Sequence, residues 1–244
     1  MSTSGKFDAL ETITQESRLQ QDSWQGTLWL APDFAILHGA VGATDSHAHY
    51  AHQLMLSTGA PFTAELDGIV HTARHLLIES LRPHAIVAAP AFMLTIYAEP
   101  QRLSGAALLA AAHAGAPTLD NVAAALQAQP REHLPDPRLR RALEQVDALL
   151  SGKVSAAAVA GAAHLSLSQL ERLFSAQLGL PVRRLVLWRR LRLAIRFILL
   201  GSTLTDAAHG AGFADAAHFS RTMRSLFGVR ADRSLRQLKV KLLD

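Results

Sequence analysis

The sequence predicts an α+β protein of two domains: an N-terminal β-barrel or sandwich followed by helices, and then an all-α C-terminal domain with two helix-turn-helix motifs. Three observations carry this prediction. Short apolar runs separated by glycine and proline fill residues 26–99, helical periodicity fills most of the rest, and one pattern occurs twice after residue 154. A length of 244 residues suits two domains of modest size.

Seven short apolar runs between residues 26 and 99 have the composition of β-strands. Turn residues such as Gly39, Gly59 and Pro83 separate them, and this regular spacing is typical of a sandwich or a small barrel. The predicted strands are Thr27–Ala31, Phe34–His38, Gln53–Ser57, Phe62–Leu66, Leu76–Ile78, Ile86–Ala88 and Met93–Tyr97. The polar residues 1–25 lack the apolar core of a signal peptide, and we expect a loosely ordered lead-in there.

From residue 103 the chain becomes rich in alanine and helical in pattern. Helices are predicted over Gly105–His113 and Leu119–Gln127, and a proline-rich linker follows at residues 130–137. Residues 139–150 then form the first helix of the next domain. We therefore expect domains at residues 1–130 and 136–244.

One pattern occurs twice in the C-terminal half, at a constant offset of 49 residues. Residues 166–180 align with residues 215–229, so that apolar side chains fall on apolar side chains and Arg172 falls on Arg221. A constant offset over this length predicts a duplicated structural unit.

Each copy is predicted to be a short helix, a tight turn and a second helix. Ser166 and Asp215 are placed to cap the second helix of each copy, and Gly228 is placed to end the later one. This plan is that of a helix-turn-helix motif, at residues 155–178 and 203–227, whose second helix enters the major groove of DNA. The outward side chains expected to contact DNA are Ser168, Glu171, Arg172, Ala216, Ala217, His218 and Arg221. The alternative is a pair of helical hairpins in a plain bundle.

A long helix is predicted between the two copies, over residues 182–200. Pro181 precedes it and Gly201 follows it, which is the usual asymmetry of helix ends. Its length of about 28 Å is close to one turn of DNA, about 34 Å, so it could set the two motifs in successive major grooves. Six arginines crowd its surface, and we expect Arg190 among them, together with Arg224 of the second copy, to contact phosphates.

Charge is divided unevenly along the chain. From Lys153 to the end there are 15 Lys and Arg against 5 Asp and Glu, a balance of +10, whereas residues 1–152 have a balance of −6. A basic helical domain of this kind is the electrostatic footprint of a protein that binds the phosphate backbone.

Residues 212–228 resemble the signature of the AraC/XylS family of bacterial transcription regulators. The residues that carry the resemblance in the second copy are Gly212, Phe213, Asp215, His218, Phe219, Ser220, Arg221, Arg224, Phe227 and Gly228. Val159, Ser166, Leu170, Arg172, Phe174, Gly179 and Pro181 resemble the first motif of that family, and Arg190, Leu191 and Ala194 its linker helix. The resemblance covers about 90 residues. It implies a seven-helix domain whose third and sixth helices read double-stranded promoter DNA, and RNA polymerase as a partner if the protein is an activator.

The chain departs from the family pattern after the last helix-turn-helix. The family's usual Ser-Pro is Arg230-Ala231 here, and its following Tyr-Arg falls near Ser234 and Leu235. We expect these changes to bear on how the last helix docks and not on the helices that read DNA.

A histidine-rich stretch in the predicted barrel resembles the cupin motif. His47 and His49 face the same way if they lie on a strand, so both imidazoles could reach one metal ion. His84 resembles the further histidine of metal-binding cupins, while Gln53 stands where the motif has a glutamate. We expect a cupin-like sensor domain with a small-molecule effector pocket at His47, His49 and Gln53, and a divalent metal held by His47, His49 and His84 as one alternative.

Composition limits the class of protein. The chain has no cysteine, which excludes disulfides and thiolate metal sites and fits a cytoplasmic location. The sequence contains no uninterrupted run of about 18 apolar residues, the length that a membrane-spanning helix needs. We expect a DNA-binding regulator that is not an enzyme; the alternatives are a metal-dependent cupin enzyme fused to a DNA-binding domain and an architectural DNA binder. The oligomeric state stays open, although Leu119–Gln127 is an alanine-rich amphipathic helix, and the resemblance implies that regulators of this family often form homodimers through such a helix.

Overall fold

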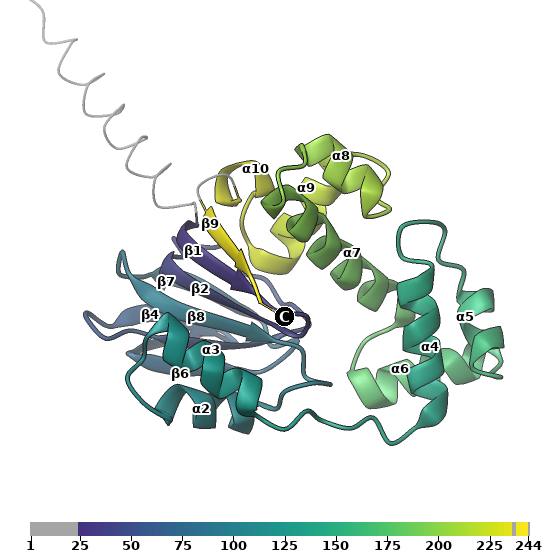
Figure 1. Cartoon of the computed structure of the whole chain (residues 1–244), viewed down its shortest axis with the longest axis horizontal. Helices are drawn as coiled ribbons and strands as arrows, with labels where there is room; N and C mark the ends of the chain where they lie inside the picture. Colours follow the sequence, from purple (N-terminus) through teal and green to yellow (C-terminus); the bar gives the residue numbers. More distant parts are fainter. Residues whose placement is uncertain (1–23, 236–237, 244) are drawn as a thin grey trace, which may run out of the picture.

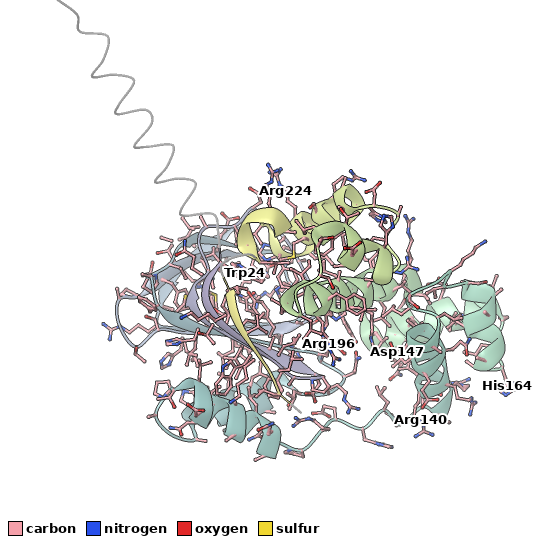
Figure 2. The ribbon with its side chains drawn as sticks, turned by 45° about the horizontal axis from the view of Figure 1, so that its top comes forward. Trp24, Arg140, Asp147, His164, Arg196 and Arg224 are labelled. Atoms are coloured by element: carbon pink, nitrogen blue, oxygen red, sulfur yellow. The ribbon has the colours of Figure 1, made fainter. Side chains whose placement is uncertain are left out.

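The computed structural model of the chain describes residues 24–235 and 238–243. It places a strand-rich N-terminal part beside an all-helical C-terminal part (Figure 1), and side chains of both parts fill the space between them (Figure 2). Of the expected lead-in, residues 1–23 lie outside the described residues, whereas Trp24 is buried and Gln25 begins the first strand. Within the described part of the chain, no helix has the length and apolar character needed to cross a membrane.

The strands form two sheets. The larger has the order β6-β3-β8-β2-β1-β9 and the smaller the order β5-β4-β7, and every neighbouring pair is antiparallel except β1 with β9. The strands are β1 (Gln25–Leu30), β2 (Phe34–Ala40), β3 (His52–Leu56), β4 (Phe62–Leu66), β5 (Ile69–Ala73), β6 (His75–Ile78), β7 (His84–Ala88), β8 (Met93–Ala98) and β9 (Leu238–Leu242). The prediction of a strand-rich N-terminal fold is confirmed, and it is built from these two sheets.

Two helices cover one face of the larger sheet (Figure 1). These are α2 (Gly105–His113) and α3 (Leu119–Ala128), which Ser104 and Thr118 cap through their side chains. Their buried leucines, Leu108 and Leu126, pack with Ile96 of the sheet in one apolar cluster. This layer closes one side of the N-terminal domain.

Seven helices make up the C-terminal part of the described chain, as the family resemblance implied. They are α4 (Pro137–Ala148), α5 (Ala156–Ala162), α6 (Leu167–Leu178), α7 (Val182–Leu199), α8 (Leu204–Gly210), α9 (Ala216–Phe227) and α10 (Ala231–Ser234). The helix pairs α5–α6 and α8–α9 form the two helix-turn-helix units, and α7 joins them (Figure 1).

The predicted caps of the two units are confirmed. Ser166 forms a capping box with Gln169 at the start of α6, and the Asp215 side chain accepts a hydrogen bond from His218 N at the start of α9. Gly179 and Gly228 end the two helices with φ angles of 72° and 67°, a left-handed conformation that glycine adopts without strain.

The sequence prediction missed the hairpin that contains β5. Asp67 and Gly68 have φ angles of 51° and 81° and join β4 to β5 through a two-residue turn, with Leu66 paired to Ile69. Asp-Gly is among the strongest hairpin signals in a sequence. The strand was overlooked because β5 is largely exposed and lacks the apolar face of its neighbours.

The predicted second domain, residues 136–244, differs from the structure at its end. Residues 238–242 form β9, which leaves the helices and pairs in parallel with β1, so that Leu28 lies opposite Val240. Leucine and valine alternate with lysine in β9, and this period of two is that of a strand. Lys241 also places its ammonium 4.0 Å from the centre of the Trp29 ring.

One apolar core extends across the boundary between the two parts. Phe227 at the end of α9 lies among aromatic rings of both parts, with its ring centre 5.5 Å from those of Trp24 and Tyr97 and 5.9 Å from that of Trp188. All four side chains are buried or half-buried. The end of the second unit is therefore packed against the N-terminal sheet.

Candidate DNA interface and sensor site

The first candidate DNA-reading helix is α6. Leu170, Phe174 and Leu178 are buried on one side, which leaves Ser168, Glu171 and Arg172 exposed on the other, as predicted. Arg172 makes only a local hydrogen bond, from Nε to the Ser168 carbonyl at 3.3 Å. Its guanidinium remains available for a base or a phosphate.

The second candidate helix, α9, presents a poorer set of side chains. Ala217 and Arg221 are exposed, whereas Ala216 and His218 are half-buried. The His218 ring packs edge-on against Phe213, 5.1 Å between centres, which limits its reach.

Arg224 of α9 is exposed but engaged. Its Nε and Nη2 lie 2.9 Å and 2.7 Å from Oδ2 of Asp45, a residue of the loop before β3. Arg224, which the sequence predicted to contact a phosphate, is thus paired with a carboxylate of the N-terminal domain.

The linker helix α7 uses several of its arginines inside the protein. Arg190 donates from Nε to the Leu150 carbonyl at 3.1 Å and from Nη2 to the Gly152 carbonyl at 2.5 Å, which secures the end of α4. A phosphate contact by Arg190 would have to use its remaining N–H groups or break these bonds. Arg183, Arg184 and Arg196 are exposed and keep the phosphate role that the sequence suggested.

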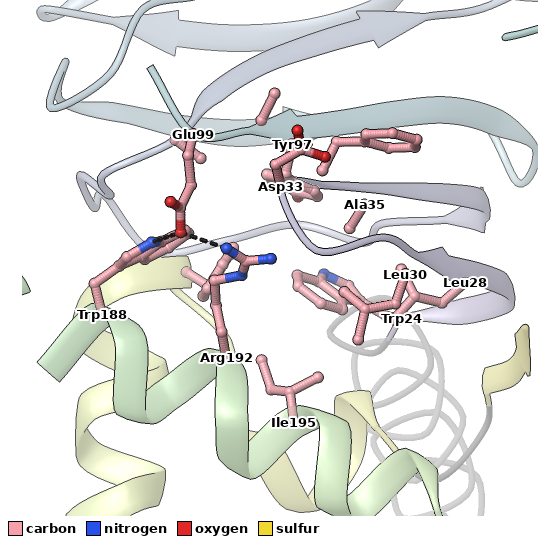
Figure 3. A pocket seen from close by; sticks show the side chains of 14 residues that line it. Trp24, Leu28, Leu30, Asp33, Ala35, Tyr97, Glu99, Trp188, Arg192 and Ile195 are labelled. Atoms are coloured by element: carbon pink, nitrogen blue, oxygen red, sulfur yellow. Dashed lines mark hydrogen bonds and ion pairs between the residues drawn. The ribbon is translucent and has the colours of Figure 1, made fainter. Parts of the chain in front are cut away.

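Glu99 anchors the linker helix to the larger sheet (Figure 3). Its carboxylate, only 4% exposed, pairs with Arg192 and accepts hydrogen bonds from Trp188 Nε1 at 3.0 Å and Gln101 Nε2 at 2.7 Å. Burial opposes ionisation of Glu99, but the positive charges of Arg192 and Arg189 and the Trp188 hydrogen bond outweigh it and hold its pKa below the usual value. Glu99 is therefore an ionised, buried contact between the domains.

An apolar cavity of about 60 Å³ lies beside this ion pair, between the sheet and α7 (Figure 3). Trp24, Tyr97, Trp188 and Phe227 contribute to its lining, with Glu99 and Arg192 among the remaining residues. Both domains line it, so its contents would affect how they pack.

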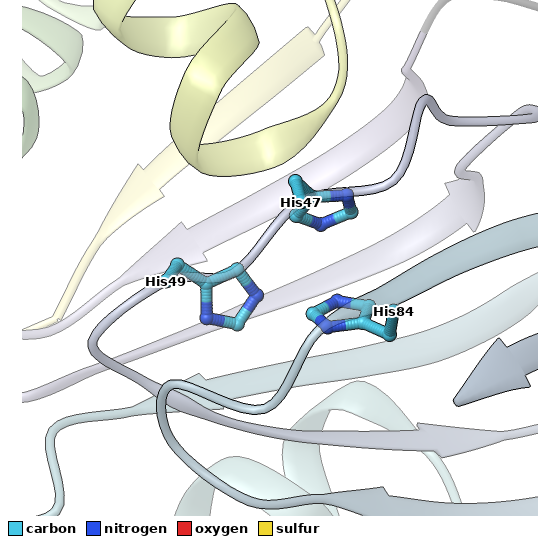
Figure 4. Close-up of side chains that lie close together, drawn as sticks. All are labelled: His47, His49 and His84. Carbon is cyan, nitrogen blue, oxygen red and sulfur yellow. The ribbon is translucent and has the colours of Figure 1, made fainter. Parts of the chain in front are cut away.

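The three predicted metal ligands converge beneath the end of α9 (Figure 4). His47, His49 and His84 are 7%, 1% and 2% exposed, and the ligand atoms they offer lie within 4.8 Å of one another. Gln53, the fourth member of the cupin pattern, places Oε1 3.0 Å from His49 Nε2 and 3.2 Å from His84 Nε2.

Hydrogen bonds to the backbone orient the three imidazole rings of this cluster. Each Nδ1 lies next to a backbone carbonyl oxygen, at 2.8 Å for His47, 3.1 Å for His49 and 2.8 Å for His84. In His47 and His84 the proton therefore belongs on Nδ1, because the other tautomer would set a lone pair against the carbonyl. His49 Nδ1 also lies 3.4 Å from the Ala51 N–H, so this ring can carry its proton on either nitrogen. With the proton on Nδ1 in all three rings, the Nε2 lone pairs and the Gln53 oxygen are acceptors without a donor, an arrangement that suits a cation.

The cluster is uncharged at neutral pH. Burial and, after it, the neighbouring histidines lower the pKa of His47 to about 4 and that of His49 to about 3, while burial also lowers the pKa of His84. Neutral imidazole is the form that binds metal.

The structure brings together the predicted histidines and Gln53, and it leaves the predicted DNA-contacting residues on three separate helices, α6, α7 and α9. Sequence reasoning missed Asp45 and Glu99. The only sequence signal for Glu99 is its position, an acidic residue directly after an apolar strand; Asp45 lies in a polar loop and has none.

Comparisons with known proteins agree with the C-terminal helices. Residues 159–237 match a helix-turn-helix domain family. Transcriptional activator NphR from Rhodococcus sp is 36% identical over 92 residues, which cover 37% of this chain and 27% of NphR. Transcriptional activator RhrA from Rhizobium meliloti is 36% identical over 85 residues, covering 34% of this chain and 27% of RhrA. The match thus spans about a quarter of the length of these relatives.

A likeness in structure extends over both domains. The crystal structure of ToxT from Vibrio cholerae superimposes with a TM-score of 0.53 at 10% sequence identity, covering 82% of this chain and 95% of that one. A second ToxT structure, with bound unsaturated fatty acid, has a TM-score of 0.51. At this identity the likeness is one of fold.

Proposed function

We propose that the chain, whose C-terminal domain resembles that of the AraC/XylS family of transcription regulators, binds promoter DNA in a sequence-specific manner under the control of its N-terminal domain. The observation that carries this proposal is the duplicated helix-turn-helix, with α6 and α9 capped alike and Arg172 and Arg221 exposed at equivalent positions. Two reading helices joined by α7 suit two successive major grooves.

Footprinting of the full chain on DNA flanking its own gene tests the proposal. We expect a protected site. The logarithm of the association constant for this site should fall linearly with the logarithm of the salt concentration, because phosphate contacts release counterions. Arg184→Ala on α7 should reduce that slope by about 0.9 per lost contact. Arg74→Ala, an exposed arginine of the N-terminal domain, is the matched control and should leave the slope unchanged. A slope near zero for the wild type would exclude DNA binding.

A divalent transition metal is the effector or structural ion that the histidine cluster fits best. His47, His49 and His84 would hold it through Nε2, with Gln53 Oε1 as a weaker fourth ligand, and the bound ion would supply charge and rigidity beneath α9. An organic effector in the apolar cavity is the second candidate, favoured by its aromatic lining and by the fatty acid bound in ToxT.

Metal analysis of protein purified without a tag separates these candidates. We expect about one metal ion per chain, a fall in thermal stability on addition of a chelator, and loss of both in His49→Ala. His71→Ala, which changes a histidine outside the cluster, is the control. If the purified protein contains no metal and its thermal stability does not change on addition of a chelator, the apolar cavity would remain as the candidate effector site.

A regulator rather than an enzyme is the better interpretation of the buried cluster. Phe227 packs on His49 at 5.1 Å between ring centres, so a substrate would have to displace the end of α9 to reach the ligand atoms. A metal-dependent cupin enzyme remains the alternative, and turnover by the metal-loaded protein would establish it. If the regulator is an activator, RNA polymerase is the expected partner; pairing through α3 would make a homodimer.

A further inference from the structure

Arg224 lies on the side of α9 that faces DNA in the proposed function. Ala217, Arg221 and Arg224 follow one another at four- and three-residue steps, so their exposed side chains form one stripe along the helix. Arg224 is at the end of this stripe, where a phosphate of the DNA backbone would be met. Its guanidinium is instead bound to Asp45.

The backbone holds Asp45 in this position. Asp45 N donates to the Gly228 carbonyl at 3.1 Å, and a Cβ added to Gly228 would lie 2.4 Å from the Asp45 carbonyl oxygen. Only glycine allows so close an approach of the two chains. The next residue inward, Phe227, is 6% exposed among the rings of both domains.

The loop that carries Asp45 is itself fixed to the smaller sheet. Thr44 N donates to the Ile86 carbonyl at 3.0 Å, and Ile86 N donates back to Thr44 Oγ1 at 2.9 Å. His47 N donates to the His84 carbonyl at 2.9 Å. The Asp45 carboxylate is therefore presented to α9 by a braced loop.

We infer that Asp45 is an internal substitute for a DNA phosphate, which occupies the anion site of Arg224 and competes with DNA for the second reading helix. A carboxylate offers arginine the same charge and the same acceptor oxygens as a phosphate. Docking of α9 on the loop and insertion of the Arg224 end into DNA exclude each other. By linkage, whatever loosens the loop strengthens DNA binding.

The loop also connects this pair to the histidine cluster. The Asp45 carbonyl accepts the hydrogen bond from His47 Nδ1 at 2.8 Å, so the residue that covers Arg224 also orients a proposed metal ligand. This inference rests on the proposed DNA binding but not on the metal.

The test compares DNA binding by Asp45→Asn and Asp67→Asn in the full chain. Asp67 pairs with Arg82 at the turn between β4 and β5, with both side chains 44% exposed, so its replacement removes the same charge from the same domain. Asparagine tolerates the positive φ of Asp67. Fluorescence anisotropy with the DNA site found by footprinting measures the dissociation constants. Asp45→Asn should bind this DNA about two- to fivefold more tightly than the wild-type protein, the scale of a surface ion pair, and Asp67→Asn should bind as the wild type does.

A double-mutant cycle sharpens the result. In an Arg224→Ala background the gain from Asp45→Asn should vanish, because the site for which carboxylate and phosphate compete is gone. A gain that persists there, or equal gains from both aspartates, would show a general charge effect and overturn the inference. Equal binding by wild type and Asp45→Asn would overturn the inference alone, whereas no binding by either would overturn the proposed function with it.

Discussion

The two helix-turn-helix units share one internal plan but meet the N-terminal domain differently. A Cβ added to Gly179, at the end of α6, would lie 3.1 Å from the tip of the Leu81 side chain. The same addition to Gly228, at the end of α9, would meet backbone and the His47 ring at 2.4–2.8 Å. At its terminal glycine the first unit therefore meets the N-terminal domain through the end of a flexible side chain, and the second meets it through a backbone carbonyl and a buried ring. The two units thus have the same helix caps but different contacts with the N-terminal domain.

Glu99→Gln is expected to have the largest effect on stability, because it removes the ion pair that holds α7, the helix between the two units, to the N-terminal sheet. The variant leaves the Arg192 guanidinium half-buried beside a neutral partner, which should lower the free energy of unfolding by about 3–5 kcal/mol in urea titrations. Asp147→Asn is the control, because Asp147 is an exposed partner of Arg189 and its loss should cost about 1 kcal/mol or less. Equal losses would show that Glu99 is no special anchor.

The same carboxylate predicts a pH dependence. The pKa of Glu99 is lower in the folded protein than in the unfolded chain. Its contribution is therefore complete above the unfolded pKa, about 4.3, and is lost as the pH falls below that value, because the unfolded state takes up the proton first. The free energies of unfolding of wild type and Glu99→Gln should converge as the pH is lowered from about 5 to about 3, the range over which a glutamate titrates.

Alanine at the two helix-ending glycines tests the comparison directly. Gly179→Ala should cost about 1–2 kcal/mol, since alanine is strained in the left-handed conformation and the Leu81 side chain can move aside. Gly228→Ala should cost about 2–4 kcal/mol, because the added methyl also collides with the Asp45 carbonyl. Thermal and urea unfolding measure both. Similar costs would mean that the second unit is no more firmly docked than the first.

The remaining expected effects concern base recognition and leave the stability of the fold unchanged. Arg172→Ala should cost about 1–3 kcal/mol on the cognate site and relax base preference there, because arginine can contact a guanine through two hydrogen bonds. His218→Ala should cost less and act mainly as lost affinity, since His218 is half-buried against Phe213. Binding to a library of randomised half-sites measures both. Equal stringency in the two half-sites would contradict this division.

The C-terminal units could be predicted from sequence because their signals are local. Ser166 with Gln169, and Asp215 with His218 N, lie three residues apart, so each cap is visible in a short window. The histidine cluster was partly visible for the same reason, as His47 and His49 are close in sequence. Its convergence with His84 depended on the resemblance to cupins.

The contacts between the domains could not be predicted, because they join residues far apart in the chain. Glu99 meets Arg192, and Asp45 meets Arg224, only after both domains have folded and docked. No periodicity or spacing records such pairs. The same distance explains why the arginines of α7 were all treated as one solvent-facing or DNA-facing group, although Arg190 and Arg192 are bound within the protein.

The pairing of β9 with β1 has a consequence for biosynthesis. The edge of β1 stays unpaired on the nascent chain until residues 238–242 have emerged from the ribosome, after the whole helical domain has been made. An open strand edge invites pairing with other chains, and contacts between distant residues form slowly. Completion of the sheet thus waits for translation of the helical C-terminal domain, and β9 covers the edge of β1 only after that domain has been made.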